Sequence, residues 1–169
     1  LHLSIRRQRQ MCIRDSLPTA QKIAVGGTNL TKAKIIQAKT LFRTNEADEE
    51  AGEELYMLYN AAAAAQILAD TTLTSTDYLA GQFLREGSVR GKWMGFNWIP
   101  TERCPKVSTT RFLYAYAKSG VTLGKGADIM TKVGEDPGKG FNVRIYAKMS
   151  IGSVRVEEEK VVEIACLEP

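Results

Sequence analysis

The C-terminal part of the chain alternates between apolar and polar residues, which is the pattern of long paired strands. The alternation is unbroken over Phe141–Ser150, and the shorter run Val161–Cys166 repeats it after a charged turn at Glu157–Lys160. Because a regular strand of this kind is half buried, we expect one side of both runs to lie in a single core. The residues on that side are Phe141, Val143, Ile145, Ala147, Met149, Val162, Ile164 and Cys166.

Four shorter stretches upstream also predict strands. Leu55–Tyr59 is apolar and aromatic enough for a buried strand, and Arg111–Lys118 alternates between two faces. The run Gly91–Pro100 is rich in bulky apolar residues and stops at a proline, which cannot continue a ladder of hydrogen bonds. A strand over Ile129–Val133 leads into a turn at residues 136–138.

Two stretches carry clear helix signals. Residues 30–43 have an apolar stripe opposite basic residues, with Thr28 or Asn29 as the expected N-cap. The alanine-rich residues 61–70 follow Asn60, and alanine is the best helix former. Both are therefore expected to be helices that pack on the strands.

A third, shorter helix is expected from Thr76 or Asp77 to Arg85, with Gly87 as its stop signal. Helices and strands are thus mixed in the first part of the chain, and mostly antiparallel strands follow. This order predicts an α+β fold.

Residues 1–16 match no folded element. The stretch QMCIRDS resembles the translated end of a sequencing adapter, so we interpret the segment as a disordered artefact and leave it out of the fold. The alternative is a basic N-terminal arm that binds nucleic acid or membrane, because four arginines lie within nine residues. They are Arg6, Arg7, Arg9 and Arg14.

This segment accounts for most of the net charge. The chain has 23 basic and 19 acidic residues and a net charge of +4, and residues 1–16 hold four of the basic and one of the acidic residues. The rest is therefore close to neutral, which gives no reason to expect a nucleic-acid groove. The segment also holds His2, the only histidine, so the rest lacks the residue that catalytic triads and most zinc sites use.

One glycine-rich stretch resembles a phosphate-binding loop superficially. A Walker A motif has four residues between its glycines and a Ser or Thr after the lysine. Here only three residues separate Gly120 from Gly124, and Gly126 follows Lys125. We interpret the stretch as a turn between strands.

The remaining candidates for chemistry also favour structural roles. One acidic group, expected in a solvated loop, lacks the spacing of a calcium loop and comprises Asp48, Glu49, Glu50, Glu53 and Glu54. A second, Glu157–Glu159, is interpreted as a charged tip. Cys104 and Cys166 are expected to be neutral thiols and not a disulfide. We therefore predict no catalytic, metal-binding or cofactor-binding residue and no cofactor.

Two stretches together resemble the C-terminal part of a tailed-phage major capsid protein. They are GKWMGFNWIPTE and GVTLGKGADIMTKVGEDPGKGFNVRIYAKMSIGSVRVEEEKVVEIAC, and the likeness runs over residues 26–166. Because each motif is a loose string of strand and turn residues, the specificity lies in their order and spacing. The resemblance implies the Hong Kong 97-type fold, with a peripheral P-domain, an axial A-domain, an extended E-loop and an N-terminal arm.

The resemblance also implies a domain division. Residues 17–119 would be A-domain-like, and residues 120–169 would be P-domain-like long strands. The E-loop and the long spine helix of the family have no counterpart, so we expect the chain to be a fragment. No cross-linking residue is carried over, because the lysine-bearing loop is missing.

Two classes of function follow. The first is a structural capsid subunit, not an enzyme, which assembles in the bacterial cytoplasm into the icosahedral shell of a tailed bacteriophage. Its implied partners are further copies in pentamers and hexamers, scaffold, portal and decoration proteins, and non-specifically bound DNA, with no membrane. The alternative is a nucleic-acid-binding protein that uses the arginine-rich arm with Trp93 and Trp98 as a stacking platform.

Deleting residues 1–16 should leave the thermal midpoint of unfolding nearly unchanged, because the segment has no apolar period that would pack on the rest. Thermal unfolding of the two chains, followed by circular dichroism, checks this. A drop of many degrees in the midpoint would instead identify the segment as a native arm.

Overall fold

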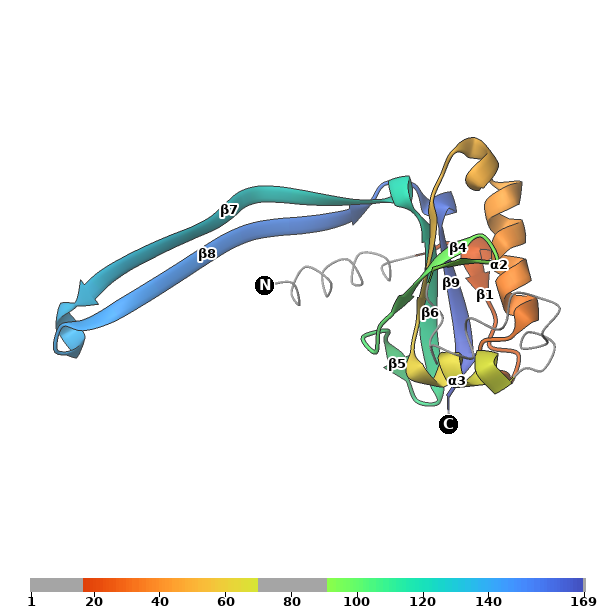
Figure 1. Cartoon of the computed structure of the whole chain (residues 1–169), viewed down its shortest axis with the longest axis horizontal. Helices are drawn as coiled ribbons and strands as arrows, with labels where there is room; N and C mark the ends of the chain where they lie inside the picture. The colour runs from red at the N-terminus through yellow and green to blue at the C-terminus, as the bar shows by residue number, and fades with distance from the viewer. Residues whose placement is uncertain (1–16, 70–90, 169) are drawn as a thin grey trace.

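The computed structural model describes residues 17–69 and 91–168. They form a body built on a seven-stranded sheet and a long two-stranded hairpin that projects from it (Figure 1). Residues 1–16 and the helix expected at residues 76–85 lie outside the described residues.

The sheet of the body mixes parallel and antiparallel strands. Its strands are β1 (Lys22–Ile23), β2 (Leu55–Tyr59), β3 (Lys92–Trp93), β4 (Phe96–Pro100), β5 (Lys106–Val107), β6 (Thr110–Ala117) and β9 (Val161–Leu167). The order across the sheet is β1-β9-β6-β2-β4-β3, and β5 pairs with β6. β1 runs parallel to β9 and β2 parallel to β4, whereas the other pairs are antiparallel. The last strand of the chain therefore lies inside the sheet, between β1 and β6.

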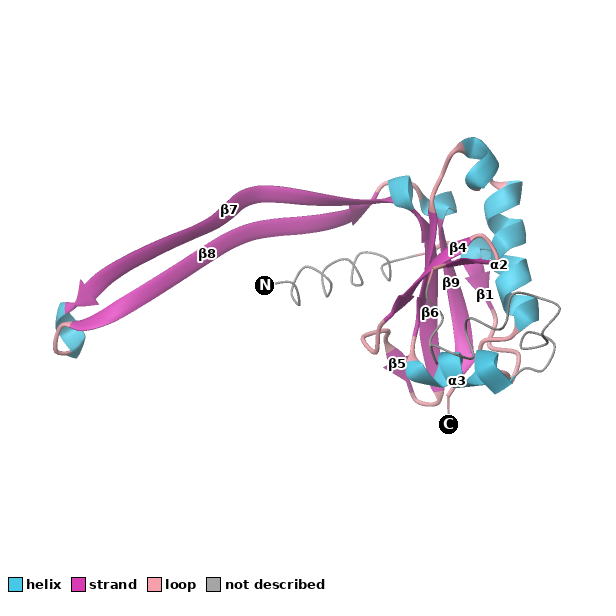
Figure 2. Ribbon diagram, in the orientation of Figure 1, coloured by secondary structure: helices cyan, strands magenta, loops and turns pink. Residues whose placement is uncertain are grey.

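Two helices and five short 3-10 turns complete the described fold (Figure 2). The helices are α2 (Lys32–Thr44) and α3 (Ala61–Ala69). The 3-10 turns are η1 (Thr19–Gln21), η2 (Glu49–Ala51), η3 (Lys118–Gly120), η4 (Pro137–Lys139) and η5 (Glu158–Lys160). α2 runs alongside β1 and β9 (Figure 1).

The helix expected at residues 30–43 is confirmed as α2, but its start differs. The helix begins at Lys32 with Thr31 as N-cap, and no side chain caps it. The side chain of Asn29 instead accepts a hydrogen bond from Leu30 N (2.8 Å), so it stabilises the turn before the helix. The predicted apolar stripe is buried, as the fully enclosed Ile35 and Phe42 show.

The strand at Leu55–Tyr59 and the capping role of Asn60 are confirmed. β2 has the predicted bounds and lies between β4 and β6. Asn60 Oδ1 accepts a hydrogen bond from Ala63 N at 3.0 Å, which satisfies one of the free donors at the start of α3.

The core fills the space between the sheet and α2. Phe42 of α2 meets Phe96 of β4 edge to face, with ring centroids 6.0 Å apart. Tyr114 of β6 and Ile164 of β9 are fully buried as well. The apolar residues of the helix and of the central strands thus form one cluster.

One lysine is buried in this body. Lys34, on α2, is 6% exposed and donates three hydrogen bonds from its ammonium group. The acceptors are the main-chain carbonyls of Val25 (2.8 Å), Thr28 (2.7 Å) and Ala165 (2.8 Å). Burial lowers the pKa of Lys34. The side chain therefore ties the loop before α2, α2 itself and β9 together.

The expected single core of the two C-terminal runs is wrong for the first run. Val162, Ile164 and Cys166 are buried as predicted, but Val143 and Ile145 are 68% and 72% exposed. Phe141 is also exposed, and Ala147 with it, while Met149 is half-buried. The strand exists, as β8 (Asn142–Arg155), but it pairs only with β7 (Val121–Asp136) outside the body. Alternation shows that a strand has an apolar side, whereas the fold decides whether anything covers that side.

The run Gly91–Pro100 is two strands and not one. β3 and β4 form a tight hairpin, and Met94 and Gly95 at its turn have φ of 50° and 82°. Gly95 is a residue type that turns favour, but Met94 is not, and it stands among bulky apolar residues, so the hydrophobic pattern alone does not show the reversal.

The turn expected at Gly120–Gly126 is wrong, and so is the start of the strand at Ile129. Gly120 does lie in a turn, η3, but residues 121–126 and Ile129–Val133 all belong to β7, a continuous strand that ends at Asp136, where the predicted reversal at residues 136–138 does occur. Gly124 lies opposite Gly152, and the register shifts twice between Lys125 and Met130. Glycines and bulges hide the period of two in the sequence.

No helix in residues 17–69 and 91–168 is long and apolar enough to cross a membrane.

Ile164→Ala should lower the free energy of unfolding by about 2–5 kcal/mol, because it removes a buried side chain from the centre of the sheet. Ile145→Ala, the same change on the projecting strand, should cost less than about 0.5 kcal/mol. Urea unfolding of both variants measures the difference. Equal costs would mean that the hairpin packs on the body.

Lys34→Met should cost about 1–3 kcal/mol, because three main-chain carbonyls lose a charged donor. Lys32→Met is the matched control, since Lys32 is exposed on the same helix. Chemical unfolding of the two variants compares them, and equal stability would refute a role for Lys34 in holding β9.

Candidate functional site

The hairpin of β7 and β8 is the most exposed feature of the described chain. The two strands pair from Val121 opposite Arg155 to Asp136 opposite Asn142, and η4 closes the far end. In Figure 1 it leads away from the body as a long, gently curved ribbon. Its surface is therefore available to other molecules.

One side of the hairpin, the apolar face, carries the apolar side chains of Val133, Val143, Ile145, Ala147 and the half-buried Met149, with Thr131 and Glu135 of β7 on the same side. Residues directly opposite in an antiparallel pair point to the same side, and Val133 lies opposite Ile145. These two side chains are 70% and 72% exposed. Soluble proteins rarely leave a cross-strand pair of large apolar side chains this exposed to water. Contiguous exposed apolar patches mark interaction sites.

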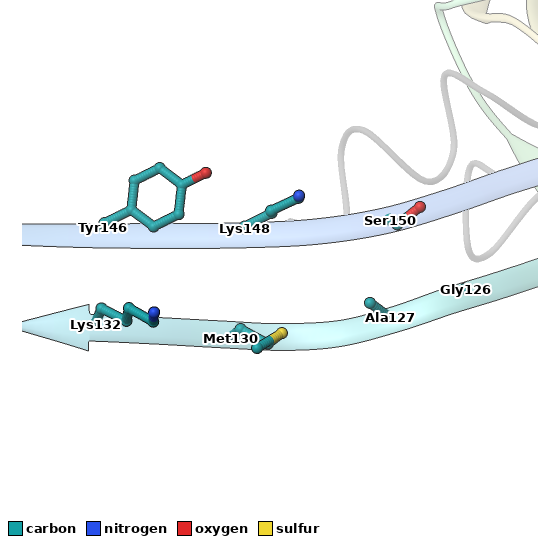
Figure 3. Close-up of a pocket in the computed structure, with 7 residues that line it drawn as sticks. All are labelled: Gly126, Ala127, Met130, Lys132, Tyr146, Lys148 and Ser150. Carbon is teal, nitrogen blue, oxygen red and sulfur yellow. The ribbon is translucent and has the colours of Figure 1, made fainter.

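The other side, the polar face, carries a different set of side chains. A pocket on it is lined by Gly126, Ala127, Met130, Lys132, Tyr146, Lys148 and Ser150, drawn in Figure 3. Lys132 lies opposite Tyr146, and Met130 lies opposite Lys148. Neither lysine forms an ion pair with a described residue of its own chain, so both ammonium groups face solvent.

The far end of the hairpin differs from the predicted pattern. Phe141, expected as the first residue of the strand, has φ of 59° and belongs to the turn, and β8 starts at Asn142. Phe141 is 68% exposed. Gly140 before it also has positive φ (65°), so the reversal uses two left-handed residues in sequence.

The hairpin joins the body at a polar cluster, which we call the root. It contains Lys160 of η5, Ser119 of η3, Glu157, and Glu53 from the segment before β2. Lys160 Nζ lies 3.2 Å from Glu53 Oε1, 2.9 Å from Ser119 Oγ and 3.1 Å from Glu157 Oε2. Ser119 also donates a hydrogen bond from Oγ to Glu53.

The electrostatics of the root agree with this geometry. Hydrogen bonding from Ser119, and then from Lys160, holds the pKa of the Glu53 carboxyl below its usual value. The hydrogen bond with Glu157 raises the pKa of Lys160. The side chains of Lys160 and Glu53 are each only 19% exposed, so solvent ions screen the attraction between them less than that of a surface ion pair.

A second polar cluster lies at the opposite end of the sheet. Arg111 of β6 makes a two-pronged ion pair with Glu168, with Nη2 to Oε1 at 3.0 Å. Asn60 donates to the same carboxylate at 2.9 Å, and Arg111 Nη1 donates to the carbonyl of Cys104 at 2.9 Å. The cluster holds the segment after β9 against β6, because the carboxylate of Glu168 accepts hydrogen bonds from both Arg111 and Asn60.

The acidic groups singled out in the sequence do not gather into one site. Asp48 is buried and pairs with Arg43 (2.9 Å), Glu49 pairs with Lys39, and Glu54 pairs with Lys118 (3.0 Å). The expectation of a merely solvated loop is thus wrong for Asp48. Glu157–Glu159 lies at the root of the hairpin and not at a tip. Within the described residues, no three His, Cys, Asp or Glu side chains are placed to hold a metal ion.

The remaining sequence candidates have structural environments. Cys104 and Cys166 are both buried free thiols, and burial raises their pKa to about 12 and about 11. They are poor nucleophiles because the thiolate is scarce near neutral pH. Trp98 is 6% exposed, and its ring packs on Trp93 and Tyr59. The stacking platform that the nucleic-acid alternative needs is therefore not available at Trp98.

Sequence reasoning missed the root and Lys34. No motif marks either, because their members come from segments far apart in the chain: Glu53 meets Lys160, and Lys34 meets Ala165. The nearest signal in the sequence is the run of three glutamates and one lysine at residues 157–160, which is typical of any surface turn.

Comparison with known proteins is informative at the level of the family. A family model described as phage capsid protein matches residues 5–168, a span that begins inside the segment 1–16. No curated protein matches the chain.

Several solved structures share the fold. A structure from Mycobacterium phage Che8 has a TM-score of 0.70 and 17% identity, over 96% of this chain and 59% of that one. The capsid of the cyanophage P-SCSP1u has a TM-score of 0.63 and 17% identity, over 96% of this chain and 60% of that one. The SrpI encapsulin complex from Synechococcus elongatus has a TM-score of 0.65 and 10% identity, over 99% and 62%.

The chain thus spans about three fifths of the length of these structures. At such low identity the likeness shows the fold alone, and it confirms the expected α+β fold of the Hong Kong 97 type. The family model matches nearly the whole chain, and its description agrees with that fold. The chain therefore belongs to the phage capsid protein family.

Proposed function

We propose that the chain is part of a structural subunit that binds copies of itself to build the icosahedral capsid of a tailed bacteriophage. The single observation that carries this proposal is the apolar face of the hairpin, in a member of the phage capsid protein family. A subunit whose task is assembly needs surfaces that are stable only when covered by a neighbour.

The position of the apolar face supports assembly through the hairpin. The pair Val133 and Ile145 lies far along a ribbon that leads away from the body (Figure 1). The described body does not cover it: β7 and β8 pair only with each other, and both side chains are largely exposed. Burial of an exposed valine or isoleucine contributes about 1.5–3 kcal/mol, so a few such residues make a substantial contact.

A structural and non-enzymatic role agrees with the chemistry of the described residues. Several of their carboxylates, among them those of Asp48, Glu53 and Glu54, are paired with lysines and arginines in separate clusters, and both buried thiols are neutral. The proposed setting is the virion shell, after assembly in the bacterial cytoplasm. The proposed partners are copies of the subunit in pentamers and hexamers, together with scaffold, portal and decoration proteins, and packaged DNA bound without sequence preference.

The domain assignment is part of the proposal. Residues 17–119 would correspond to an A-domain, and the long strands β7 and β8 within residues 120–169 to P-domain strands, with the E-loop and spine helix supplied by further sequence. The last strand, β9, departs from this division because it lies in the sheet of the body. The length of the matched structures, of which this chain covers about three fifths, supports further sequence in the complete subunit. A full-length subunit should form closed shells.

The 169-residue chain by itself should self-associate into small, irregular oligomers. Ile145→Glu should shift these toward monomer, because it places a charge in the apolar face. Size-exclusion chromatography with light scattering, and electron microscopy of the same fractions, measure the change.

Ser150→Glu is the matched control, because it adds the same charge on the polar face of the same strand. It should leave the size distribution as it is. A stable, monodisperse monomer from the unchanged chain would contradict the proposal, and so would an Ile145→Glu variant that associates as strongly as the control.

A further inference from the structure

The geometry points to a releasable joint at the root: we infer that the Lys160 cluster sets the direction of the hairpin, and that breaking it frees the hairpin to swing while body and hairpin both stay folded. This inference concerns how one chain is held together, and it stands whether or not the chain assembles with copies of itself.

The hairpin is connected to the body by two short segments only. η3 (Lys118–Gly120) joins β6 to β7, and η5 (Glu158–Lys160) joins β8 to β9. β7 and β8 form a sheet of their own, with no ladder to the strands of the body. We call these two connecting segments, η3 and η5, the neck. Because no sheet hydrogen bond joins the hairpin to the strands of the body, the neck by itself would be free to bend.

A third segment removes that freedom. Glu53, which precedes β2, accepts hydrogen bonds from Lys160 Nζ (3.2 Å) and from both the main chain and the hydroxyl of Ser119. Its neighbour Glu54 accepts at its carbonyl from Lys118 N (2.9 Å) and at its carboxylate from Lys118 Nζ (3.0 Å). The body thus holds both connecting segments through one pair of glutamates.

Close packing inside the neck keeps the two segments together. A methyl group placed on Gly120 would come within 2.7 Å of Lys160 Cβ and 3.0 Å of the Lys160 carbonyl oxygen. Val156 N also donates to the Gly120 carbonyl at 3.0 Å. Rotation of the hairpin about one segment is therefore opposed by the other, and Lys160 is the residue where the packing and the ion pairs meet.

The joint is separable from both of the parts it connects. The hairpin is held by its own ladder, which runs from Val121 to Asp136. The body is held by its apolar cluster, to which neither Lys160 nor Glu53 belongs. A few charged hydrogen bonds can thus be removed without opening either ladder or core.

Pulsed electron spin resonance between spin labels on Gln37→Cys in α2 and Thr131→Cys in β7 tests the inference. Both positions are exposed, and Cys12→Ser removes a competing thiol. Cys104 and Cys166 are buried and stay unlabelled. Labelled chain diluted into unlabelled chain reports the distance within one molecule.

The unchanged root should give one narrow distance distribution, and Lys160→Met should broaden it. Lys132→Met is the matched control, because it removes an ammonium group from the hairpin outside the root. Lys160→Arg, which keeps the charge, should keep the distribution narrow. Ser119→Ala removes only the bridging hydroxyl and should broaden the distribution less than Lys160→Met.

Circular dichroism and thermal unfolding show whether each variant stays folded. A folded Lys160→Met chain with an unchanged distribution would overturn the inference, as would a broad distribution in the unchanged chain. Unfolding of the body in Lys160→Met would also overturn it, because the root would then support the body and not only the direction of the hairpin.

Discussion

The pairing of β6 with β9 is the constraint on which the rest of the structure depends. Seven residue pairs join the strands, from Thr110 opposite Leu167 to Tyr116 opposite Val161. This pairing brings the start and the end of the long excursion between them side by side. The residues between Ala117 and Val161 must therefore leave the sheet and return at the same end of these two strands, and an antiparallel hairpin lets the chain run out and back side by side.

The body and the hairpin reach stability in different ways. The body buries its last strand between β1 and β6 and secures it with Lys34, whose ammonium group binds the carbonyl of Ala165, and with Glu168, which Arg111 holds. The hairpin is held by its own ladder alone, and its apolar face stays open to water. The strand that looks most regular in sequence, β8, thus belongs to the part of the chain with the most surface to cover.

This division explains why the candidate site is a surface and not a cavity. The charged clusters of the body are satisfied internally, as in the pairs of Asp48 with Arg43 and of Glu54 with Lys118. The hairpin presents exposed apolar side chains on one face. On the other it presents Lys132 and Lys148, which form no ion pair with a described residue. A protein built in this way has much to gain from binding, which agrees with its membership of the phage capsid protein family.

The sequence by itself determined the elements with strong local signals. The strand at Leu55–Tyr59 follows from its apolar and aromatic content, the cap from Asn60 before an alanine run, and the long strand β8 from alternation. All three signals depend on neighbouring residues only. The resemblance of ordered strands and turns also pointed to the family. The sequence did not show the turn at Met94, the extent of β7 through its glycines, or the root around Lys160.

Only the tertiary structure decided which apolar faces are buried. Ile145 and Ile164 occupy equivalent positions in two alternating strands, yet one is 72% exposed and the other is fully buried. The physical reason is that burial depends on what packs on the face of a strand: Ile164 of β9 joins the apolar cluster that the sheet forms with α2, whereas no described element packs on the apolar face of β8. A periodic pattern records which side of a strand is apolar, and contacts between distant segments determine what that side meets.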